Sequence, residues 1–366
     1  MGEVFAGRER ELRMKKALLM LLASLWIGFG LVAGNDVAFA GTMNYSVKAN
    51  IPENQINNNL TYFDLKMEPG STQTISLTVK NGSAEAIELM IEPNTAVTNQ
   101  NGVIDYSKHE HEKDSSLKYA FSELISPKQT VSLKGKETKE VPFTIQMPEE
   151  PFDGVILGGF YVYQLNQNDE PESSNQVQLK NQFSYVIGVK LSETEKTVEP
   201  VLKLNEVQAG LMNYRPVVTA NLQNIEPVIV KNLEVNARIT NEGKSVTLYE
   251  TKKSDMSMAP NSNFDFPVRW EGGRLESGKY HLYVTASDGK QSWEFDKMFE
   301  IKGEEAKQIN ENSVTTGANT AGGSKDMFIF LGMGSIIAIL VFIIVLLLRK
   351  KRGDNYEEVE PKISSS

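Results

Sequence analysis

Residues 74–92 read TISLTVKNGSAEAIELMIE. Apolar and polar residues alternate on both sides of the central Asn-Gly pair, so that Ile75, Leu77 and Val79 share one face. Such alternation is typical of a strand with one buried face, and an Asn-Gly pair between two such runs favours a tight turn. The stretch therefore predicts an antiparallel hairpin with a single core face.

The same alternation recurs from Tyr45 to Lys302, with almost no helical periodicity. Short strands separated by polar turns are typical of antiparallel β-sandwiches. The sequence thus predicts a mainly β fold with two immunoglobulin-like antiparallel β-sandwich domains, and one helical turn within 114–124. Strands at 130–133 and 141–145 are expected to pair, and others are expected at 158–163, 183–191, 217–222, 233–240, 246–250, 264–270, 279–286 and 293–301.

A membrane-spanning segment is expected near the C-terminus. Residues 327–348, MFIFLGMGSIIAILVFIIVLLL, contain no charged side chain. As a helix they would be roughly 33 Å long, enough to cross the ~30 Å hydrocarbon core of a bilayer. The basic cluster that follows, Arg349, Lys350, Lys351 and Arg352, places that flank in the cytoplasm by the positive-inside rule. We expect a single-pass protein with its N-terminal domains outside the cell and residues 349–366 as a cytoplasmic tail.

The first 40 residues predict a signal peptide. Basic residues precede an apolar run, and AFA at 38–40 offers a cleavage site between Ala40 and Gly41. Met14 opens the sequence MKKALLMLL and is a more natural start than Met1. A retained N-terminal membrane helix is the competing interpretation, which the glycines of the apolar run and the cleavage motif weaken.

The chain between these segments is long enough for two domains, predicted at 41–165 and 166–302. Residues 166–175, NQNDEPESSN, are polar and turn-rich, and form either a linker or a long hairpin loop. Residues 303–326 are polar with scattered glycines, which predicts a flexible stalk.

Composition narrows the class of protein. The chain has no cysteine and a formal net charge of −9. An exported chain of this size without disulfides fits a bacterial surface better than a eukaryotic one. The negative charge argues against a nucleic-acid partner, because such binding depends on clustered Lys and Arg.

No catalytic, metal or cofactor site is predicted. The cluster His109-Glu110-His111-Glu112 lacks the spacing that places two histidines on one helical face, and is interpreted as a solvated loop. His281 is expected on a strand surface, and Trp270 and Trp293 are expected in the core rather than as stacking platforms for sugars. Carboxylates are abundant, so a membrane-anchored wall-modifying enzyme remains an alternative. A chaperone-like protein that donates a strand to secreted partners is another.

Several sequence blocks resemble the WxL-interacting proteins of low-GC Gram-positive bacteria. They are 46–47, 51–55 (IPENQ), 62–65 (YFDL), 69–70, 98–102, 104–107, 147–148 and 152–159 (FDGVILGG). The resemblance covers essentially the whole chain after the signal peptide. The chain itself contains no W-x-L, and no L-P-x-T-G sorting signal precedes its apolar segment, so it is expected to stay attached through the bilayer.

The resemblance implies a cell-surface scaffold or adhesion protein rather than an enzyme. It implies that the first domain binds peptidoglycan, that the second binds host extracellular-matrix proteins, and that WxL-domain surface proteins are partners. Amide, carboxylate and aromatic side chains within the matching blocks are the candidate ligand-binding residues, although they could equally cap turns. They are Glu53, Asn54, Gln55, Tyr62, Asp64, Asp105 and Tyr106.

Overall fold

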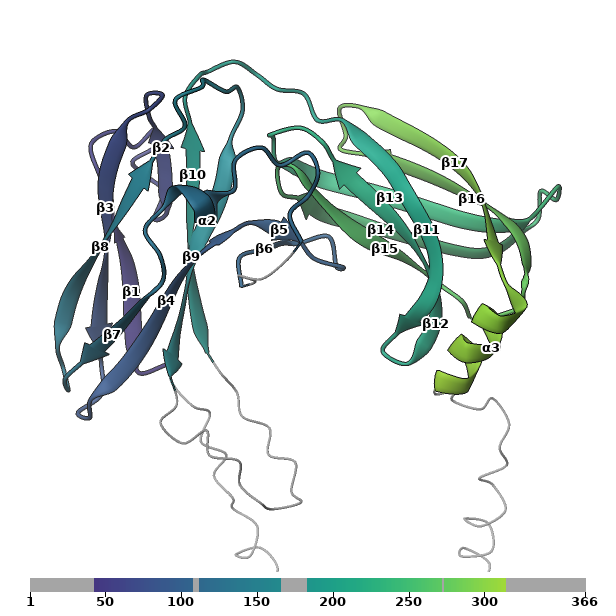
Figure 1. The fold of residues 1–366 in the computed structure, drawn as a ribbon, viewed down its shortest axis with the longest axis horizontal. Coiled ribbons are helices and arrows are strands. Elements are labelled where there is room, and N and C mark those ends of the chain that lie inside the picture. The colour runs from purple at the N-terminus through teal and green to yellow at the C-terminus, as the bar shows by residue number, and fades with distance from the viewer. Residues whose placement is uncertain (1–42, 108–111, 166–182, 272, 314–366) are drawn as a thin grey trace, which may run out of the picture. The chain divides into compact units, whose positions relative to one another are not determined.

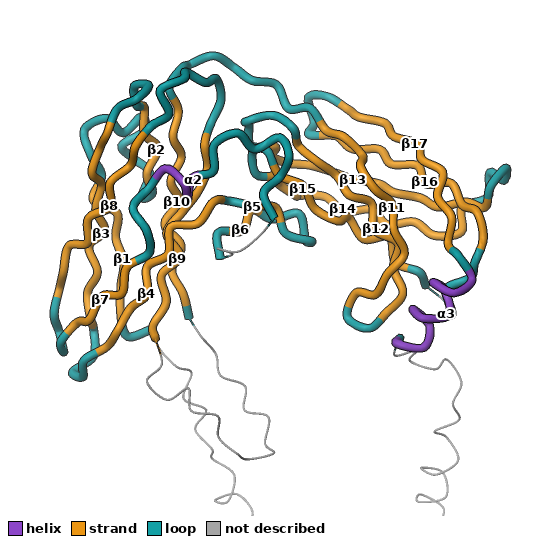
Figure 2. Tube along the Cα trace, viewed as in Figure 1, coloured by secondary structure: helices purple, strands orange, loops and turns teal. Residues whose placement is uncertain are grey.

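The computed structural model describes residues 43–107, 112–165, 183–271 and 273–313. Strands dominate these residues, as Figure 2 shows, so the prediction of a mainly β protein is confirmed. They divide into two compact units, each with its own hydrophobic core. The first unit contains the residues before 97 together with 106–113 and 118–197, and the second contains 97–105, 114–117 and the residues from 198 onward.

The first unit is a sandwich of two sheets (Figure 1). One sheet has the strand order β1-β3-β8 and the other has the order β2-β10-β9-β4-β7. The strands are β1 (Tyr45–Asn50), β2 (Phe63–Lys66), β3 (Thr72–Asn81), β4 (Ile87–Thr95), β7 (Gln129–Leu133), β8 (Thr138–Gln146), β9 (Ile156–Leu165) and β10 (Ser184–Ser192), and a single helical turn, α2 (Phe121–Leu124), lies in the predicted region.

Alternate side chains of both sheets fill the core of this unit. Phe143 from the three-stranded sheet packs on Phe160 from the five-stranded sheet, with ring centroids 4.6 Å apart. Complete burial of each such ring contributes about 1.5 to 3 kcal/mol through removal of apolar surface from water. The alternation of Ile75, Leu77 and Val79 on one buried face, predicted from the sequence, is confirmed.

The hairpin predicted across residues 74–92 is wrong. β3 pairs with β1 and β8, whereas β4 pairs with β7 and β9 in the opposite sheet. The predicted pairing of 130–133 with 141–145 is wrong for the same reason, because β7 and β8 also belong to different sheets. Both connections therefore carry the chain across the sandwich instead of turning within one sheet.

The side chain of Asn81 explains the first of these crossings. Neither Asn81 nor Gly82 has the positive φ that a tight Asn-Gly hairpin turn requires. Asn81 is fully buried, and its Nδ2 donates to the carbonyl oxygens of Glu85 at 2.7 Å and Lys134 at 3.0 Å. The buried amide thus bonds backbone carbonyl groups of both connections and ties them together.

Strand β10 belongs to the first unit, although the sequence placed residues 183–191 in the second domain. It pairs antiparallel with β9 along eight residues and parallel with β2 from Val189 to Ser192. The β2–β10 pair also departs from the predicted all-antiparallel sheet. Period-two alternation identifies a strand and its buried face, but does not identify the neighbouring strand.

The second unit is also a sandwich. Its sheets have the orders β11-β12-β15 and β14-β13-β16-β17, with a two-stranded ribbon β5-β6 beside them. The strands are β5 (Val97–Thr98), β6 (Ile104–Asp105), β11 (Leu202–Met212), β12 (Arg215–Asn224), β13 (Val230–Asn241), β14 (Thr247–Met258), β15 (Ser262–Arg269), β16 (Gly278–Ser287) and β17 (Ser292–Ile301). Trp270 is buried in this core and Trp293 packs against it, as predicted.

Two early segments of the chain complete the second unit. The Thr98 hydroxyl lies 2.6 Å from that of Ser262 and accepts from Ala259 N at 3.0 Å. Asp114 accepts from the side chains of Gln223 and Asn263 at 2.7 and 2.5 Å. The second unit therefore contains two segments, 97–105 and 114–117, that precede its main part by about a hundred positions. It is not one continuous stretch of sequence, as the predicted domain boundaries assumed.

The predicted stalk at 303–326 begins with a helix, α3 (Gly303–Asn312), so that prediction is wrong for these residues. Ala306 is buried in the second core, and the Asn310 side chain bonds both backbone groups of Leu275. The few apolar residues of this polar segment are spaced so that they form one buried face of a helix. No helix among the described residues is long and apolar enough to cross a membrane. The predicted signal peptide, the basic cluster 349–352 and the predicted membrane segment 327–348 lie outside them.

Candidate functional site

Gln55 fastens the loop that leads into β2. Its Nε2 donates to the carbonyl oxygens of Tyr62 at 2.9 Å and Asn57 at 3.2 Å, and its Oε1 accepts from Asp64 N at 2.9 Å. The side chain is buried, and both ends of its amide are hydrogen-bonded. Gln55 therefore holds the backbone in place and presents no free polar group to a ligand.

The side chain of Asn54 is also hydrogen-bonded within the first unit. Its amide and that of Gln73 form a reciprocal pair, with both N···O distances at 2.8 Å, and its Nδ2 also donates to Lys66 O at 2.9 Å. These contacts tie the loop to β2 and to the three-stranded sheet of the same unit. Glu53, by contrast, is exposed.

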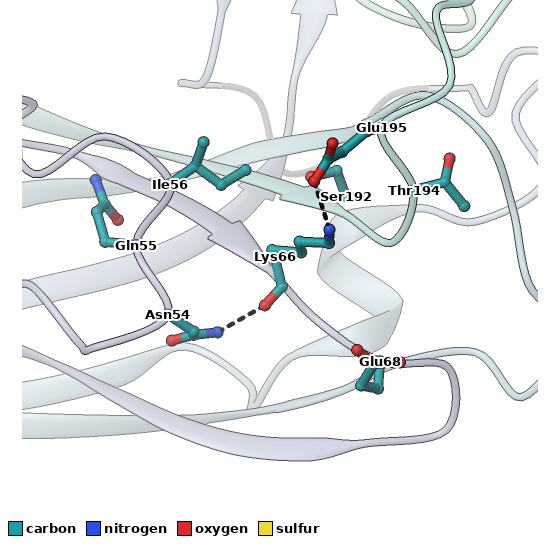
Figure 3. A pocket seen from close by; sticks show the side chains of 8 residues that line it. All are labelled: Asn54, Gln55, Ile56, Lys66, Glu68, Ser192, Thr194 and Glu195. Carbon is teal, nitrogen blue, oxygen red and sulfur yellow. Dashed lines mark hydrogen bonds and ion pairs between the residues drawn. The ribbon is translucent and has the colours of Figure 1, made fainter.

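These two residues form one wall of an open pocket of about 480 Å³. Figure 3 shows Lys66 reaching across it toward Glu195, with Nζ 2.7 Å from Oε1. The hydrogen bond to Lys66 lowers the pKa of Glu195, and the same bond raises the pKa of Lys66. The remaining lining residues are Ile56, Glu68, Ser192 and Thr194.

The segment that carries Glu195 is held by the FDGVILGG block. Phe152 N donates to Glu193 Oε2 at 2.9 Å, and the Asp153 carboxylate accepts from Thr194 and Lys196 at 2.8 and 2.6 Å. Burial raises the pKa of Glu193, and its buried Oε1 has no hydrogen-bond partner. Residues of the IPENQ block thus line the pocket, and the FDGVILGG block holds the segment that forms its other side.

The consecutive glycines of this block admit aromatic rings on both faces of β9. A Cβ on Gly158 would lie 2.0 Å from Cδ1 of the core residue Phe121. A Cβ on Gly159, on the other face, would lie 2.9 Å from Cδ1 of Tyr106. Only glycine leaves room for both rings, which gives the Gly-Gly pair a packing role.

Tyr62 and Tyr106 lie on the outward face of the five-stranded sheet. Gly188 pairs with Gly159 in the register, and Tyr62 lies over Gly188 with its Cβ 3.9 Å from the position that a glycine Cβ would take. Burial and then the nearby Tyr62 raise the pKa of Tyr106. The backbone of Tyr106 is held by Asn94, whose Nδ2 donates to Tyr106 O at 2.8 Å. The two tyrosines are therefore brought together although 44 positions apart in sequence.

The other predicted candidates have separate locations. Asp64 is buried and forms an ion pair with Lys190 at 2.9 Å, without the alignment of a good hydrogen bond. Asp105 lies in β6, in the second unit. The structure thus groups Asn54 with Gln55 and Tyr62 with Tyr106, and does not unite the seven candidates in one site.

Sequence reasoning missed several residues of these surfaces. Nothing in the sequence marked Lys66 or Glu195, because their contact joins positions 129 residues apart. Tyr161 and Tyr163 could have been found, since FYVY in a predicted strand places both tyrosines on one face.

The described residues contain no group of three or more His, Asp or Glu side chains placed to hold a metal ion. His109, Glu110 and His111 lie outside them, so the prediction for that cluster stays untested. His281 is half-buried on its strand, with Nε2 3.1 Å from Asp296 Oδ1 and its ring 4.2 Å from that of Tyr283.

Comparison with known structures gave similarities to fimbrial chaperones and related domains. They include a chaperone-tip adhesin complex of CFA/I fimbriae (11% identity, TM-score 0.28, 70% of this chain and 98% of the other) and the E. coli chaperone DraB (17%, 0.27, 70% and 97%). A PapD-like domain of human CEP192 gave 13% identity and a TM-score of 0.26, over 45% of this chain and 97% of the other. Similarities at these TM-scores carry no functional information. A comparison with curated proteins gave no match.

Two protein-family models match the sequence in succession. Residues 45–164 match the peptidoglycan binding domain of the WxL Interacting Protein, and residues 174–311 match its host binding domain. Both are binding domains rather than enzyme families. Together they cover almost all of the described residues, in the order that the resemblance implied. The chain therefore belongs to the family of WxL-interacting proteins.

Proposed function

We propose that this protein is a membrane-anchored scaffold of the bacterial cell surface, whose first domain binds peptidoglycan and whose second binds host protein. The observation that carries the proposal is the succession of the peptidoglycan-binding and host-binding family models along one chain. The described residues add two sandwich units with separate cores, each able to present its own binding surface.

The membrane anchor is the segment 327–348. Its length, its lack of charge and the four basic residues after it support a single crossing with the tail inside the cell. Protease treatment of intact cells tests this topology. Degradation of the N-terminal domains with survival of a tag placed after Ser366 is the expected result, and a tag that is cleaved in intact cells would contradict it.

The partners of the scaffold are peptidoglycan, WxL-domain surface proteins and host extracellular-matrix proteins. Peptidoglycan and a host partner are supported by the descriptions of the two matched domains, and WxL-domain proteins by the name of the family. That the host partner is an extracellular-matrix protein is what the family resemblance implies. A protein of this kind would hold secreted proteins close to the wall while itself remaining fixed in the bilayer.

Sedimentation with insoluble peptidoglycan is the primary test. The full chain, purified in detergent, should sediment with peptidoglycan and should capture a purified WxL-domain protein in a pull-down. If the chain captures the WxL protein but does not sediment, attachment to the wall is indirect and the peptidoglycan assignment is wrong. If it does neither, the scaffold proposal is wrong.

Point variants of the full chain suit this protein better than isolated domains. A fragment that begins after residue 165 would lack the segments 97–105 and 114–117, which belong to the second unit. A fragment that ends at residue 165 would lack β10, which lies between β2 and β9 in the first unit. If either fragment failed to bind, the cause would be its incomplete fold rather than the absence of a binding surface.

A further inference from the structure

Tyrosine side chains gather on the outward face of the five-stranded sheet of the first unit. Phe160 and Val162 of β9 point into the core, so Tyr161 and Tyr163 between them point outward. Their ring centroids are 5.3 Å apart and their planes are inclined by 43°. We define the tyrosine face as these two residues together with Tyr62 and Tyr106.

The register between β9 and β10 determines which residues are neighbours on the tyrosine face. Tyr106 and Tyr62 cover the Gly159–Gly188 pair, and the next outward pair along β9 and β10 is Tyr161 with Val186. From Gly159 to Tyr163 the strand advances four residues, roughly 13 Å at ~3.3 Å per residue. Tyr62 and Val186 keep 40% and 43% of their surface exposed. The aromatic surface thus follows the strands as a ledge that is long enough for more than one sugar ring.

Polar groups border the rings on the β4 side. Glu92 pairs with Tyr161 in the register, and its Oε1 accepts from the Tyr163 hydroxyl at 3.3 Å. Lys128 Nζ lies 3.6 Å from the same oxygen. Glu92 is itself almost fully buried, with 4% of its surface exposed. The Tyr163 hydroxyl is therefore held in place beside a buried carboxylate.

We propose that the glycan strand of peptidoglycan binds along the tyrosine face, with sugar rings packed on Tyr161 and Tyr163. This inference rests on the proposed peptidoglycan-binding function, and it identifies the surface and the part of the polymer that is recognised. The C–H faces of a sugar ring pack on aromatic rings, while its hydroxyl and N-acetyl groups need polar partners at the edge. Tyrosine supplies both in one side chain, with few rotatable bonds to immobilise.

The location of the face favours the glycan over the stem peptide. β9, the strand that carries Tyr161 and Tyr163, is an interior strand, paired with β10 from Ile156 to Tyr163 and with β4 from Gly158 to Leu165. An extended peptide gains affinity by adding to an open strand edge, which an interior strand does not offer. Recognition here must come from side chains, which suits a polymer of rings. The residues of the face also lie within the part of the chain matched to the peptidoglycan-binding family, 45–164.

The test is peptidoglycan sedimentation with the full chain in detergent, using the double variant Tyr161→Thr/Tyr163→Thr. Threonine keeps the strand propensity of these positions and removes both rings. We expect the Kd for insoluble peptidoglycan to rise about tenfold or more, as is typical for loss of aromatic anchors. Tyr163→Phe keeps the ring and should retain most of the binding. Glycan strands freed of peptide by an amidase should compete with insoluble peptidoglycan, and soluble stem peptide should not.

Tyr214→Asn is the matched control, because it removes a tyrosine that is 69% exposed in the second unit, at a positive φ that asparagine tolerates. It should bind like the parent chain, and thermal unfolding should show all variants folded. Unchanged binding by the folded double variant would overturn the proposal while leaving the peptidoglycan function intact. Competition by stem peptide and not by glycan strands would also overturn it. If the parent chain fails to sediment, the proposed function itself fails.

Discussion

Asp114 Oδ1 accepts a 2.7 Å hydrogen bond from Nε2 of Gln223, although the two residues lie 109 positions apart in sequence. Asn263 donates to the other carboxylate oxygen at 2.5 Å, and Ser116 donates to Oδ1 from both its backbone and its hydroxyl. One carboxylate thus attaches the segment 114–117 to strands β12 and β15 of the second unit.

The Asp114→Asn variant should lower the free energy of unfolding at pH 7 by about 1 to 3 kcal/mol, because an amide cannot accept all of these bonds. Urea unfolding measures the change. Asp255→Asn is the control, since Asp255 is exposed and sits at a positive φ that asparagine also accepts. An equal effect of the two substitutions would show that the Asp114 contacts contribute nothing specific.

The Asp114 carboxylate should also make the free energy of unfolding depend on pH. Burial would raise the pKa of Asp114, but hydrogen bonds from Asn263, Ser116 and Gln223 outweigh burial and lower it. Its contribution is therefore present above the unfolded pKa of ~3.9 and is lost as pH falls through the lower, folded pKa. Unfolding curves below pH 4 should lose stability more steeply for the parent chain than for Asp114→Asn.

Glu193 should have the opposite effect. Burial raises its pKa, so the folded state retains a proton that the unfolded state has released. Stability is then greatest below the unfolded pKa of ~4.3 and falls as pH rises through the higher, folded pKa. Glu193→Gln should remove this decline, as followed by thermal unfolding from pH 4 upward. A decline that persists in the variant would assign the effect to another group.

Gly158→Ala should destabilise the first unit. The new Cβ would lie 2.0 Å from Cδ1 of Phe121, which is fully buried and cannot move away. Overpacking of this kind costs about 1 to 3 kcal/mol, so the unfolding temperature should fall by several degrees. Gly210→Ala is the matched control within a strand, because no atom lies within 4 Å of its added Cβ. An unchanged melting temperature for Gly158→Ala would contradict the packing role.

Gln55→Ala should act through stability rather than through direct contact with peptidoglycan. It leaves the amide of Asp64 and the carbonyl oxygen of Tyr62 without their partner, at a cost of about 1 to 3 kcal/mol. Urea unfolding should show this loss, whereas Glu53→Ala at the exposed neighbour should be neutral. If folded Gln55→Ala is as stable as the parent but loses peptidoglycan binding, Gln55 is a contact residue and the structural interpretation is wrong.

Asn310→Ala should destabilise the second unit. Its side chain accepts from Leu275 N at 2.7 Å and donates to Leu275 O at 2.9 Å, so both bonds are lost together. The expected cost is about 1 to 2 kcal/mol in the free energy of unfolding. Asn312→Ala is the control two residues on, since its side chain bonds only within its own helix. Equal stability of the two variants would mean that α3 is not fastened to the unit.

The sequence by itself determined which residues form strands and which of their faces are buried. The alternation from Thr74 to Lys80 reflects the two sides of a strand, which is a local property of the backbone. The family could also be identified, because the blocks that carry the resemblance are contiguous runs of residues. The same blocks did not reveal whether Gln55 and Asn54 contact a ligand or the backbone of their own loop.

Only the tertiary structure decided which strands become neighbours. β3 and β4 are separated by a short turn and yet join opposite sheets, because the buried side chain of Asn81 stabilises a crossing instead of a hairpin. In the same way, Tyr62, Tyr106 and Tyr161 form one surface only because β2, β9 and β10 are adjacent and two glycines leave room for the rings. Pairing between distant strands depends on contacts between residues far apart in sequence, which a local pattern of apolar and polar residues does not reveal. For that physical reason the tyrosine face could not be predicted from the sequence.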